Sequence, residues 1–499
     1  MPPALLRESA NWITKGRNEA LEDPSVLNRR QQQTVDPARL NRQQMLAYNI
    51  LASHHAALNG ANPPEPLQVV ITGTAGSGKS YLINAIKSPL GDTCILTRTT
   101  GLAGYNIDGC TLHSALQLPV RNHNNNDLQG TVLQRLQLPF SGKQYVITDE
   151  MSMLGQRTLA WVDKRLRQAT GKLNEPLGGI SVMLLGDFAQ LPPFGGKPIY
   201  ASPSKSSSLF AQHGHSIYGL FETVVMLSEN VRQAGNNPEA EQFRAILLRL
   251  RDGQSTQDDW MTLCQRTPRH VNMSFFTDAP RLYFDKLSVA KYNFEKLKNL
   301  GSQIARISGL HSGRNAKNAT SDDAGGLDAM LTSNLWQEVG LCNGGTGVVE
   351  DLLFHPDRPP PCLPIAALVH FTNHTGPAFL ATNPKTVPLP PHLFEWESDG
   401  QRLSRQQLPL RLRYAMTIHK SQGQTLPQVV VDVGKAERAA GSSFVAISRV
   451  PSLQNLVLQP MSFQRLQAIG KSKQLQERLR EEERSRNLAE VTALRYEHL

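Results

Sequence analysis

The 499-residue sequence predicts an α/β protein with a mostly parallel sheet in its first part, a small β domain, and further buried strands after that domain. From Leu40 to about Ser202, apolar strand-like runs alternate with helical patterns, which is typical of a mostly parallel sheet with helices on both faces. Residues 341–405 contain many prolines around short strand-like runs, which favours a small β barrel. Buried strand patterns return over residues 408–460.

Changes in composition divide the chain into expected segments. The first segment is polar and glutamine-rich at its end, so we expect a flexible tail. The last segment is highly charged, so we expect a solvated surface helix. An asparagine cluster marks a small insertion in the first sheet region. The expected segments are 1–38 (tail), 39–202 (first sheet region), 119–142 (its insertion), 203–340 (second sheet region, first part), 341–405 (β domain), 406–470 (second sheet region, remainder) and 471–499 (charged helix).

The overall composition permits a polyanionic partner and argues against a membrane protein. Lysine and arginine exceed aspartate and glutamate by 52 − 42, a net charge of +10 that suits nucleic acid. No run approaches the roughly 18 apolar residues that span a bilayer, and the first residues resemble neither a secretory signal nor a transit peptide. The scattered cysteines form no C-x-x-C pair, which argues against a zinc site and favours a reducing compartment. We expect an intracellular protein, nuclear in a eukaryote.

The stretch "GTAGSGKS" at residues 73–80 matches the phosphate-loop pattern G-x-x-x-x-G-K-[ST]. The apolar run "LQVVIT" precedes it and "YLINAI" opens a helix after it. Glycines let the backbone fold around phosphate oxygens, and N–H groups at the helix N-terminus meet negative charge. We expect Lys79 to reach the β- and γ-phosphates of ATP and Ser80 to bind Mg²⁺; a glycine-rich turn without a ligand is the alternative. The expected nucleotide contacts are Gly73, Thr74, Ala75, Gly76, Ser77, Gly78, Lys79 and Ser80.

Two acidic residues follow the buried strand pattern "YVIT" at residues 145–148. Neighbouring side chains at a strand end diverge, so one carboxylate can hold a metal while the next faces water. We therefore predict that Asp149 binds Mg²⁺ and that Glu150 orients and deprotonates the attacking water. An ordinary surface pair of acids is the alternative.

A third strand pattern opens the stretch "VMLLGDFAQLPPF" at residues 182–194. The strand is expected to end at Gly186 and Asp187. Gln190 follows shortly after, where its amide can hydrogen-bond to a γ-phosphate. Phe188 is expected on a turn, where an aromatic ring can stack on a nucleic-acid base. Burial of Phe188 in the core is the competing interpretation.

These motifs and several others, in order along the chain, resemble the petite-integration-frequency (Pif) DNA helicases of superfamily one, which are relatives of RecD. The likeness covers about residues 40–470. The segments that carry it are "LNRQQ" (40–44), "TRTTGLAGYNIDGCTLHSAL" (97–116), "DEMSML" (149–154), "GDFAQLPPF" (186–194), "LSENVRQ" (227–233), "AMLTSNLWQEVGLCNGGTGVV" (329–349) and "FVAISRV" (444–450). A further likeness is to the helicase part of Helitron-type transposases.

The resemblance implies a fold of two RecA-like P-loop domains in tandem, with an SH3-like β-barrel insertion. It also implies roles for six more residues: Gln44 (adenine base), Arg232 and Arg449 (γ-phosphate), and Thr99, Thr100 and His113 (single-stranded DNA). Because both arginines lie far in sequence from Lys79, we expect ATP in a cleft between two sheets. An arginine in this role is worth about 10³–10⁵ in rate; a plain surface charge is the alternative.

The polar loop "TIHKSQGQT" at 417–425 directly precedes the apolar run "VVVDV". At this position it can face both the nucleotide cleft and a nucleic-acid track, although a merely structural loop is the alternative. Charged and amide side chains suit the sugar–phosphate backbone without reading bases. The expected DNA contacts are His419, Lys420, Ser421 and Gln422, and the expected nucleotide contacts are Gly423 and Gln424.

The function that follows is an ATP-dependent DNA helicase that translocates 5′→3′ on single-stranded DNA and unwinds duplexes in repair, recombination, replication or transposition. We expect single-stranded and forked DNA as partners, a monomer, and a wedge formed by residues 119–142. The alternative within the motor class is a RecD-like subunit of a recombination or conjugation complex. A non-hydrolysing nucleotide switch is less consistent with the complete hydrolytic set, and a nuclease would need a further carboxylate cluster.

Overall fold

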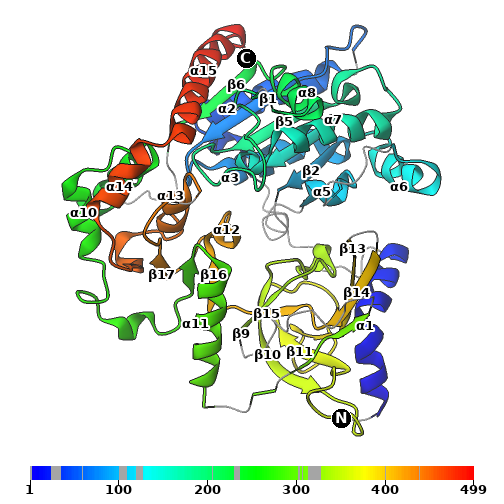
Figure 1. Ribbon diagram of the computed structural model, residues 1–499. Coiled ribbons are helices and arrows are strands. Elements are labelled where there is room, and N and C mark those ends of the chain that lie inside the picture. Colours follow the sequence, from blue (N-terminus) through cyan, green and yellow to red (C-terminus); the bar gives the residue numbers. More distant parts are fainter. Residues whose placement is uncertain are drawn as a thin grey trace. The chain divides into compact units, whose positions relative to one another are not determined.

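The protein is described from a computed structural model (Figure 1). The described residues are 3–23, 35–58, 60–99, 109–119, 127–204, 206–229, 237–301, 304–305, 307–312, 328–398, 401–437 and 439–499. The chain forms two compact units, each built from two segments distant in sequence. Unit 1 consists of Met1–Gln32 and Asp278–Lys420, and unit 2 of Gln33–Thr277 and Ser421–Leu499.

Unit 2 contains a six-stranded sheet in which every neighbouring pair of strands is parallel. Its strands, in spatial order, are β3 (Cys110–Thr111), β2 (Cys94–Arg98), β4 (Tyr145–Asp149), β5 (Ser181–Gly186), β1 (Gln68–Gly73) and β6 (Thr223–Leu227). The carboxyl ends of parallel strands meet at one edge of a sheet, where ligands bind in such folds. The predicted parallel sheet is therefore confirmed.

Helices cover both faces of this sheet, which explains the unbroken apolar runs of its strands. Val69 and Ile71 of β1 lie in one core cluster, whereas Val70 lies in the cluster on the opposite face. The helices around the sheet are α2 (Arg42–Ala57), α3 (Lys79–Leu90), α5 (Leu112–Ala115), α6 (Gly130–Phe140), α7 (Gln156–Thr170) and α8 (Leu209–Tyr218).

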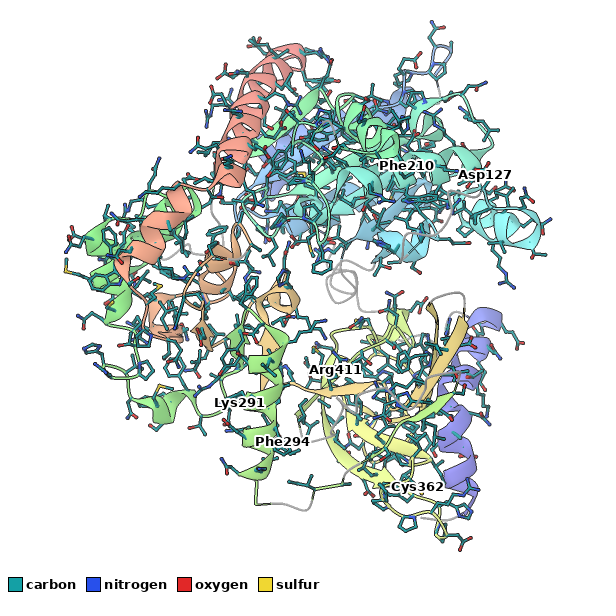
Figure 2. The ribbon with its side chains drawn as sticks, viewed as in Figure 1. Asp127, Phe210, Lys291, Phe294, Cys362 and Arg411 are labelled. Atoms are coloured by element: carbon teal, nitrogen blue, oxygen red, sulfur yellow. The ribbon has the colours of Figure 1, made fainter. Side chains whose placement is uncertain are left out.

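The described part of the predicted insertion is helix α6, which packs on α7. Leu136 and Phe140 of α6 are buried. Asp127, which precedes the helix and is labelled in Figure 2, forms an ion pair of 2.9 Å with Lys164 of α7. These contacts hold α6 on the sheet region. A wedge function for residues 119–142 stays a prediction.

The remainder of unit 2 combines the segments on either side of unit 1. Strands β17 and β18 pair in parallel, with Val430 opposite Val457. Ser442–Ile447 of α13 is entirely buried. The elements are α9 (Pro238–Arg251), α10 (Gln257–Cys264), β17 (Val429–Asp432), α13 (Ser442–Ile447), β18 (Leu456–Leu458), α14 (Phe463–Gly470) and α15 (Lys473–Arg495).

The charged C-terminal helix α15 is not the solvated element that the sequence suggests. It packs along β6, as Figure 1 shows. The Thr492 hydroxyl accepts a hydrogen bond of 3.0 Å from the Val224 N–H, and Tyr218 donates one of 2.6 Å to Glu481. The buried face of α15 carries polar side chains whose partners lie on other elements. A hydrophobic pattern therefore could not reveal its packing.

Unit 1 is largely antiparallel β structure. One sheet has the order β12 (Thr386–Leu389), β11 (Ala366–His370), β10 (Thr346–Leu353), β9 (Asp328–Leu331) and β15 (Leu410–Leu412), and a second has the order β13 (His392–Ser398), β14 (Gln401–Gln407) and β8 (Leu310–Ser312). The β domain thus draws on strands on both sides of residues 341–405. Its SH3-like character stays a prediction. The unit also contains β7 (Arg281–Tyr283), which pairs in parallel with β16 (Ala415–Thr417), α11 (Lys286–Lys298) and the start of α12 (Ile418–Ser421).

Helix α1 (Pro3–Glu22) corrects the expectation of a flexible tail over residues 1–38. The Trp12 ring lies 6.0 Å from the ring of Trp336 and 5.9 Å from that of His374. Arg17 donates a 3.2 Å hydrogen bond to the Leu335 carbonyl, and a Cβ on Gly16 would come within 2.6 Å of the Trp336 ring. The helix is therefore an integral part of the β domain, as Figure 1 shows. None of the described helices is both long and apolar enough to cross a membrane.

Candidate active site

The phosphate loop lies between β1 and α3 at the carboxyl edge of the six-stranded sheet. Gly76 and Gly78 have φ angles of 92° and 78°, a region that L-residues with a side chain rarely adopt. A Cβ on Gly73 would lie 2.4 Å from the Ser77 Oγ. The chain needs glycine at these positions to form the loop, and α3 then begins at Lys79. The strand–loop–helix context predicted for "GTAGSGKS" is present.

Lys79 lies folded against its own loop. Its Nζ donates to the carbonyl oxygens of Gly73 at 2.7 Å and Thr74 at 3.0 Å. The ammonium group is therefore held where the loop backbone curls around a phosphate, and β- and γ-phosphate oxygens could replace these carbonyls as its acceptors.

Gln44 joins α2 to the phosphate loop. Its Nε2 donates to the Ser77 carbonyl at 3.3 Å, and its Oε1 accepts the Asn41 N–H at 3.1 Å as half of a capping box. The side chain is buried next to the loop, as a nucleotide-binding residue should be. Its contact with an adenine base stays a prediction.

Asp149 and Ser80 converge on a single nitrogen atom. The Nη2 of Arg98 lies 2.6 Å from the Asp149 Oδ2 and donates to the Ser80 Oγ at 3.3 Å. A carboxylate and a hydroxyl oxygen are suitable donors for Mg²⁺, so the predicted pair fits that ion. The point between them is held by the guanidinium group. Elsewhere in the described chain, no cluster of three or more His, Cys, Asp or Glu residues could hold a metal.

Glu150 is a buried acid whose pKa is raised. It has a left-handed backbone (φ 61°, ψ 46°) and a buried side chain. Burial and the neighbouring Asp149 charge raise the pKa of Glu150, while a hydrogen bond from Gln422 and the charges of Arg98 and Lys79 oppose that rise. A carboxyl group with a raised pKa is suited to proton transfer near neutral pH.

Gln422 contacts the predicted catalytic base. Its Nε2 donates to the Glu150 Oε2 at 3.0 Å and to the Ser152 Oγ at 3.2 Å. The predicted contact of Gln422 with the DNA backbone stays a prediction; in this structure the Gln422 amide donates to Glu150. The polar loop at 417–425 therefore reaches the hydrolytic site directly.

Arg449 is tied to the same loop. Its Nη1 donates to the carbonyl oxygens of Gln424 at 3.2 Å and Ser421 at 3.4 Å, and its Nε to the Val445 carbonyl at 2.7 Å. Its side chain is buried. Gly423 turns the loop with a φ of 76°. Arg449 and residues 421–424 thus form one hydrogen-bonded group, whose contact with a γ-phosphate stays a prediction.

Phe188, which follows the third strand, does not lie on an exposed turn as expected. The Phe188 ring packs edge-on against Tyr200 at 4.8 Å and near Tyr218 at 6.2 Å, and the side chain is buried. The expected base-stacking role for Phe188 is therefore wrong, because the ring belongs to the core. Gln190 is buried, and within the described part of the chain its Oε1 has no hydrogen-bond partner.

Comparison with known proteins finds similarity to DNA helicases. Residues 40–260 match the model of the PIF1-like helicase family. Over 411 residues the chain is 29% identical to the ATP-dependent DNA helicase PIF1 of Homo sapiens, covering 78% of this chain and 57% of that protein. The ATP-dependent DNA helicase PIF6 of Trypanosoma brucei brucei is 27% identical over 418 residues, covering 78% of this chain and 50% of the relative. Over these residues the chain is similar to the PIF1-like helicases. It spans between half and about 60% of the length of such curated relatives.

Solved structures of PIF1-like helicases share its fold. The crystal structure of Pif1 helicase from Candida albicans matches with a TM-score of 0.67 and 23% identity, covering 89% of this chain and 98% of that one. Bacteroides Pif1 bound to ssDNA matches with a TM-score of 0.62 and 23% identity, covering 86% and 93%. These likenesses confirm the predicted fold class, an α/β protein with tandem RecA-like domains.

The remaining predicted site residues divide into three groups. Thr99 donates to the Glu150 carbonyl at 3.2 Å, and with the exposed His113 it lines a cavity of about 670 Å³. His419, whose ring lies 5.8 Å from that of Phe284, and Lys420 belong to unit 1. Thr100 and Arg232 lie outside the described residues.

Two charged residues of the site were missed by the sequence analysis. Arg98 ends the apolar run "CILTR" and pairs in register with Asp149. A charged residue at the end of a buried strand was the sequence signal that could have identified it. Arg251 forms a 2.9 Å ion pair with buried Asp187 of the third strand end. No local pattern links Arg251 to that strand, because it lies 64 residues further along the chain.

Proposed function

We propose that this chain is an ATP-dependent DNA helicase that moves 5′→3′ along single-stranded DNA and separates duplexes. The human and trypanosome relatives are named ATP-dependent DNA helicases, and a solved structure of similar fold is that of a Pif1 bound to ssDNA. The observation that carries the proposal is the hydrogen bond between Gln422 and Glu150. It links the group that would activate water to the loop that would follow the DNA.

The hydrolytic chemistry follows from the residues around the phosphate loop. Lys79 and the N-terminal N–H groups of α3 bind the phosphates. Mg²⁺, held by Ser80 and Asp149 when bound, would supply charge neutralisation to the phosphate oxygens. Glu150 holds the attacking water by hydrogen bonding and receives its proton. Arg232 and Arg449 are the candidates for neutralising the negative charge that spreads over the γ-phosphoryl oxygens.

Coupling to DNA follows from the position of Gln422 in the loop at 417–425. The residues before it, His419 and Lys420, would bind DNA phosphates. A shift of this loop on binding DNA would move the Gln422 amide relative to Glu150 and so change the orientation of the base. We therefore expect slow ATP hydrolysis by the protein alone and much faster hydrolysis with single-stranded DNA.

A second DNA contact would come from the sheet region. The cavity of about 670 Å³ is lined by Thr99 and His113 together with polar groups that include Arg157 and Ser207. Such groups bind a sugar–phosphate backbone without reading its sequence. Binding through phosphates releases counterions, so affinity should fall steeply as salt is raised.

Unwinding of partial duplexes tests the proposal. Substrates with a 5′ tail, a 3′ tail or no tail are incubated with ATP, and strand separation is measured. Unwinding of the 5′-tailed substrate alone is expected. Separation of neither tailed substrate, or ATP hydrolysis that is equally fast with and without DNA, would contradict the proposed function; unwinding only from the 3′ tail would contradict its direction.

A further inference from the structure

Arg98 occupies the point on which the predicted metal ligands converge. It is the last residue of β2 and lies beside Asp149, the last residue of β4, in the parallel register. Its Nη2 contacts both the Asp149 Oδ2 and the Ser80 Oγ, and the Arg98 and Asp149 side chains are only 3% and 4% exposed. A guanidinium nitrogen and a divalent ion cannot share that position.

Both carboxylate oxygens of Asp149 already have partners. Oδ2 contacts Arg98, and Oδ1 accepts the Glu150 N–H at 2.8 Å. A buried carboxylate without a counterion is strongly unfavourable, and a charge-assisted hydrogen bond of 2.6 Å is the strong kind. The guanidinium thus neutralises Asp149 in the nucleotide-free protein, a task that the ion performs once bound.

The Arg98 side chain is itself incompletely satisfied. Its Nε is buried and has no hydrogen-bond partner in the part of the chain that the structure describes. A buried N–H without an acceptor is unfavourable. Arg98 is therefore held mainly by the charge of Asp149, and its position loses its main support once that charge is neutralised from another source.

We propose that Arg98 is a built-in counterion that stands in for the divalent cation, so that the metal enters the site only together with nucleotide phosphates. Free Mg²⁺ must displace a bound positive charge, and Asp149 and Ser80 alone offer one negative charge in return. Phosphates bring further negative charge to the same point, which favours the ion and gives the displaced guanidinium an alternative partner. This inference rests on the proposed nucleotide site but not on DNA unwinding.

Metal binding to the nucleotide-free protein tests the proposal. Mn²⁺ serves as the probe, and its bound fraction is measured by electron paramagnetic resonance with and without ADP. The wild-type protein is expected to bind Mn²⁺ at this site only when ADP is present. Arg98→Met should bind Mn²⁺ without ADP more tightly than wild type by at least about tenfold, which is about 1.4 kcal/mol. Adding Asp149→Asn to Arg98→Met should remove the gain.

A matched control is Arg165→Met. Arg165 is also buried, and its Nη1 donates to Gln168 on α7, away from the phosphate loop. This variant loses a buried guanidinium but should bind no additional Mn²⁺. Thermal unfolding gives a second readout: Arg98→Met should unfold at a lower temperature than wild type without cations and regain part of the loss when Mn²⁺ is added.

Two outcomes would overturn the proposal. One is Mn²⁺ binding by the nucleotide-free wild-type protein that Asp149→Asn abolishes, a result that requires no folded Arg98 variant. The other is a folded Arg98→Met protein that binds Mn²⁺ no better than wild type. Neither measurement involves DNA, so failure of the helicase assay leaves this inference standing, and its failure leaves the helicase assay interpretable.

Discussion

The side-chain amide of Gln422 donates a hydrogen bond of 3.0 Å to the carboxylate of Glu150, across 272 residues of chain. The donor stabilises the charged form of Glu150, whereas burial and Asp149 favour the neutral form. Gln422 thus acts on both the position and the protonation of the proposed base. A change of loop conformation at Gln422 would alter both properties together.

Replacing Gln422 with alanine should shift the pH dependence of ATP hydrolysis. Loss of the donor raises the pKa of Glu150 further, and the base works only when deprotonated. The acidic limb of the kcat profile should therefore move to higher pH, and stimulation by single-stranded DNA should decrease. The measurement is kcat against pH at saturating DNA. Ser152→Ala, which removes the other acceptor of the Gln422 amide, is the control and should leave the acidic limb in place.

Replacing Lys79 with alanine should abolish ATP hydrolysis and unwinding while single-stranded DNA binding persists. The ammonium group is held in the phosphate loop by the Gly73 and Thr74 carbonyls, and the residues proposed to bind DNA lie elsewhere in the sequence. ATPase assays and fluorescence anisotropy with a labelled oligonucleotide measure the two properties. Lys87→Ala, on the same helix, should retain both. Loss of DNA binding by a well-folded Lys79→Ala protein would argue against the assignment.

Replacing Arg251 with methionine should destabilise unit 2. Arg251 contacts Asp187 at 2.9 Å and Glu482 of α15 at 2.6 Å. Without it the buried Asp187 would lose its ion-pair partner, and breaking a buried pair in this way costs about 3–5 kcal/mol. The free energy of unfolding in urea measures the effect. Arg486→Met removes an exposed ion pair on α15 and should cost less than about 1 kcal/mol.

The same ion pair predicts how stability depends on pH. Burial alone would raise the pKa of Asp187, but Arg251 and Lys79 outweigh it and hold the pKa below 3.8. The stabilisation is therefore present above the unfolded pKa and is lost as pH falls through the lower folded value. Wild-type protein should lose this contribution on acidification below about pH 4. Arg251→Met should show a smaller loss over that range, and an equal slope for both proteins would contradict the prediction.

The strand–loop–helix context of the phosphate loop could be predicted because its signals are local. The apolar run of β1 is buried on both faces, and the glycines at 76 and 78 lie where the backbone requires a left-handed conformation. Asp149 and Glu150 were found in the same way, as polar residues directly after a buried strand.

The contacts that the sequence did not reveal connect residues far apart in the chain. Arg98 meets Asp149 across strands, and Gln422 meets Glu150 from another part of unit 2. The prediction for Phe188 was wrong for a different reason. An aromatic residue after a strand is equally compatible with an exposed turn and with a core position. Helix α15 was misjudged because polar side chains such as Glu481 and Thr492 form its buried face.

Helix α1 gives the last prediction, because its half-buried Trp12 contacts Trp336, His374 and Phe379 of the β domain. Trp12→Ala should expose α1 and the strands beneath it and lower the local stability by about 2 kcal/mol, less than for a fully buried tryptophan. Hydrogen exchange of the full chain should show lost protection in α1 and β12, with β1 and β4 of the other unit unchanged. The exposed neighbour Asn11, replaced by alanine, is the control. Unchanged protection of β12 in Trp12→Ala would mean that α1 only rests on the β domain without stabilising it.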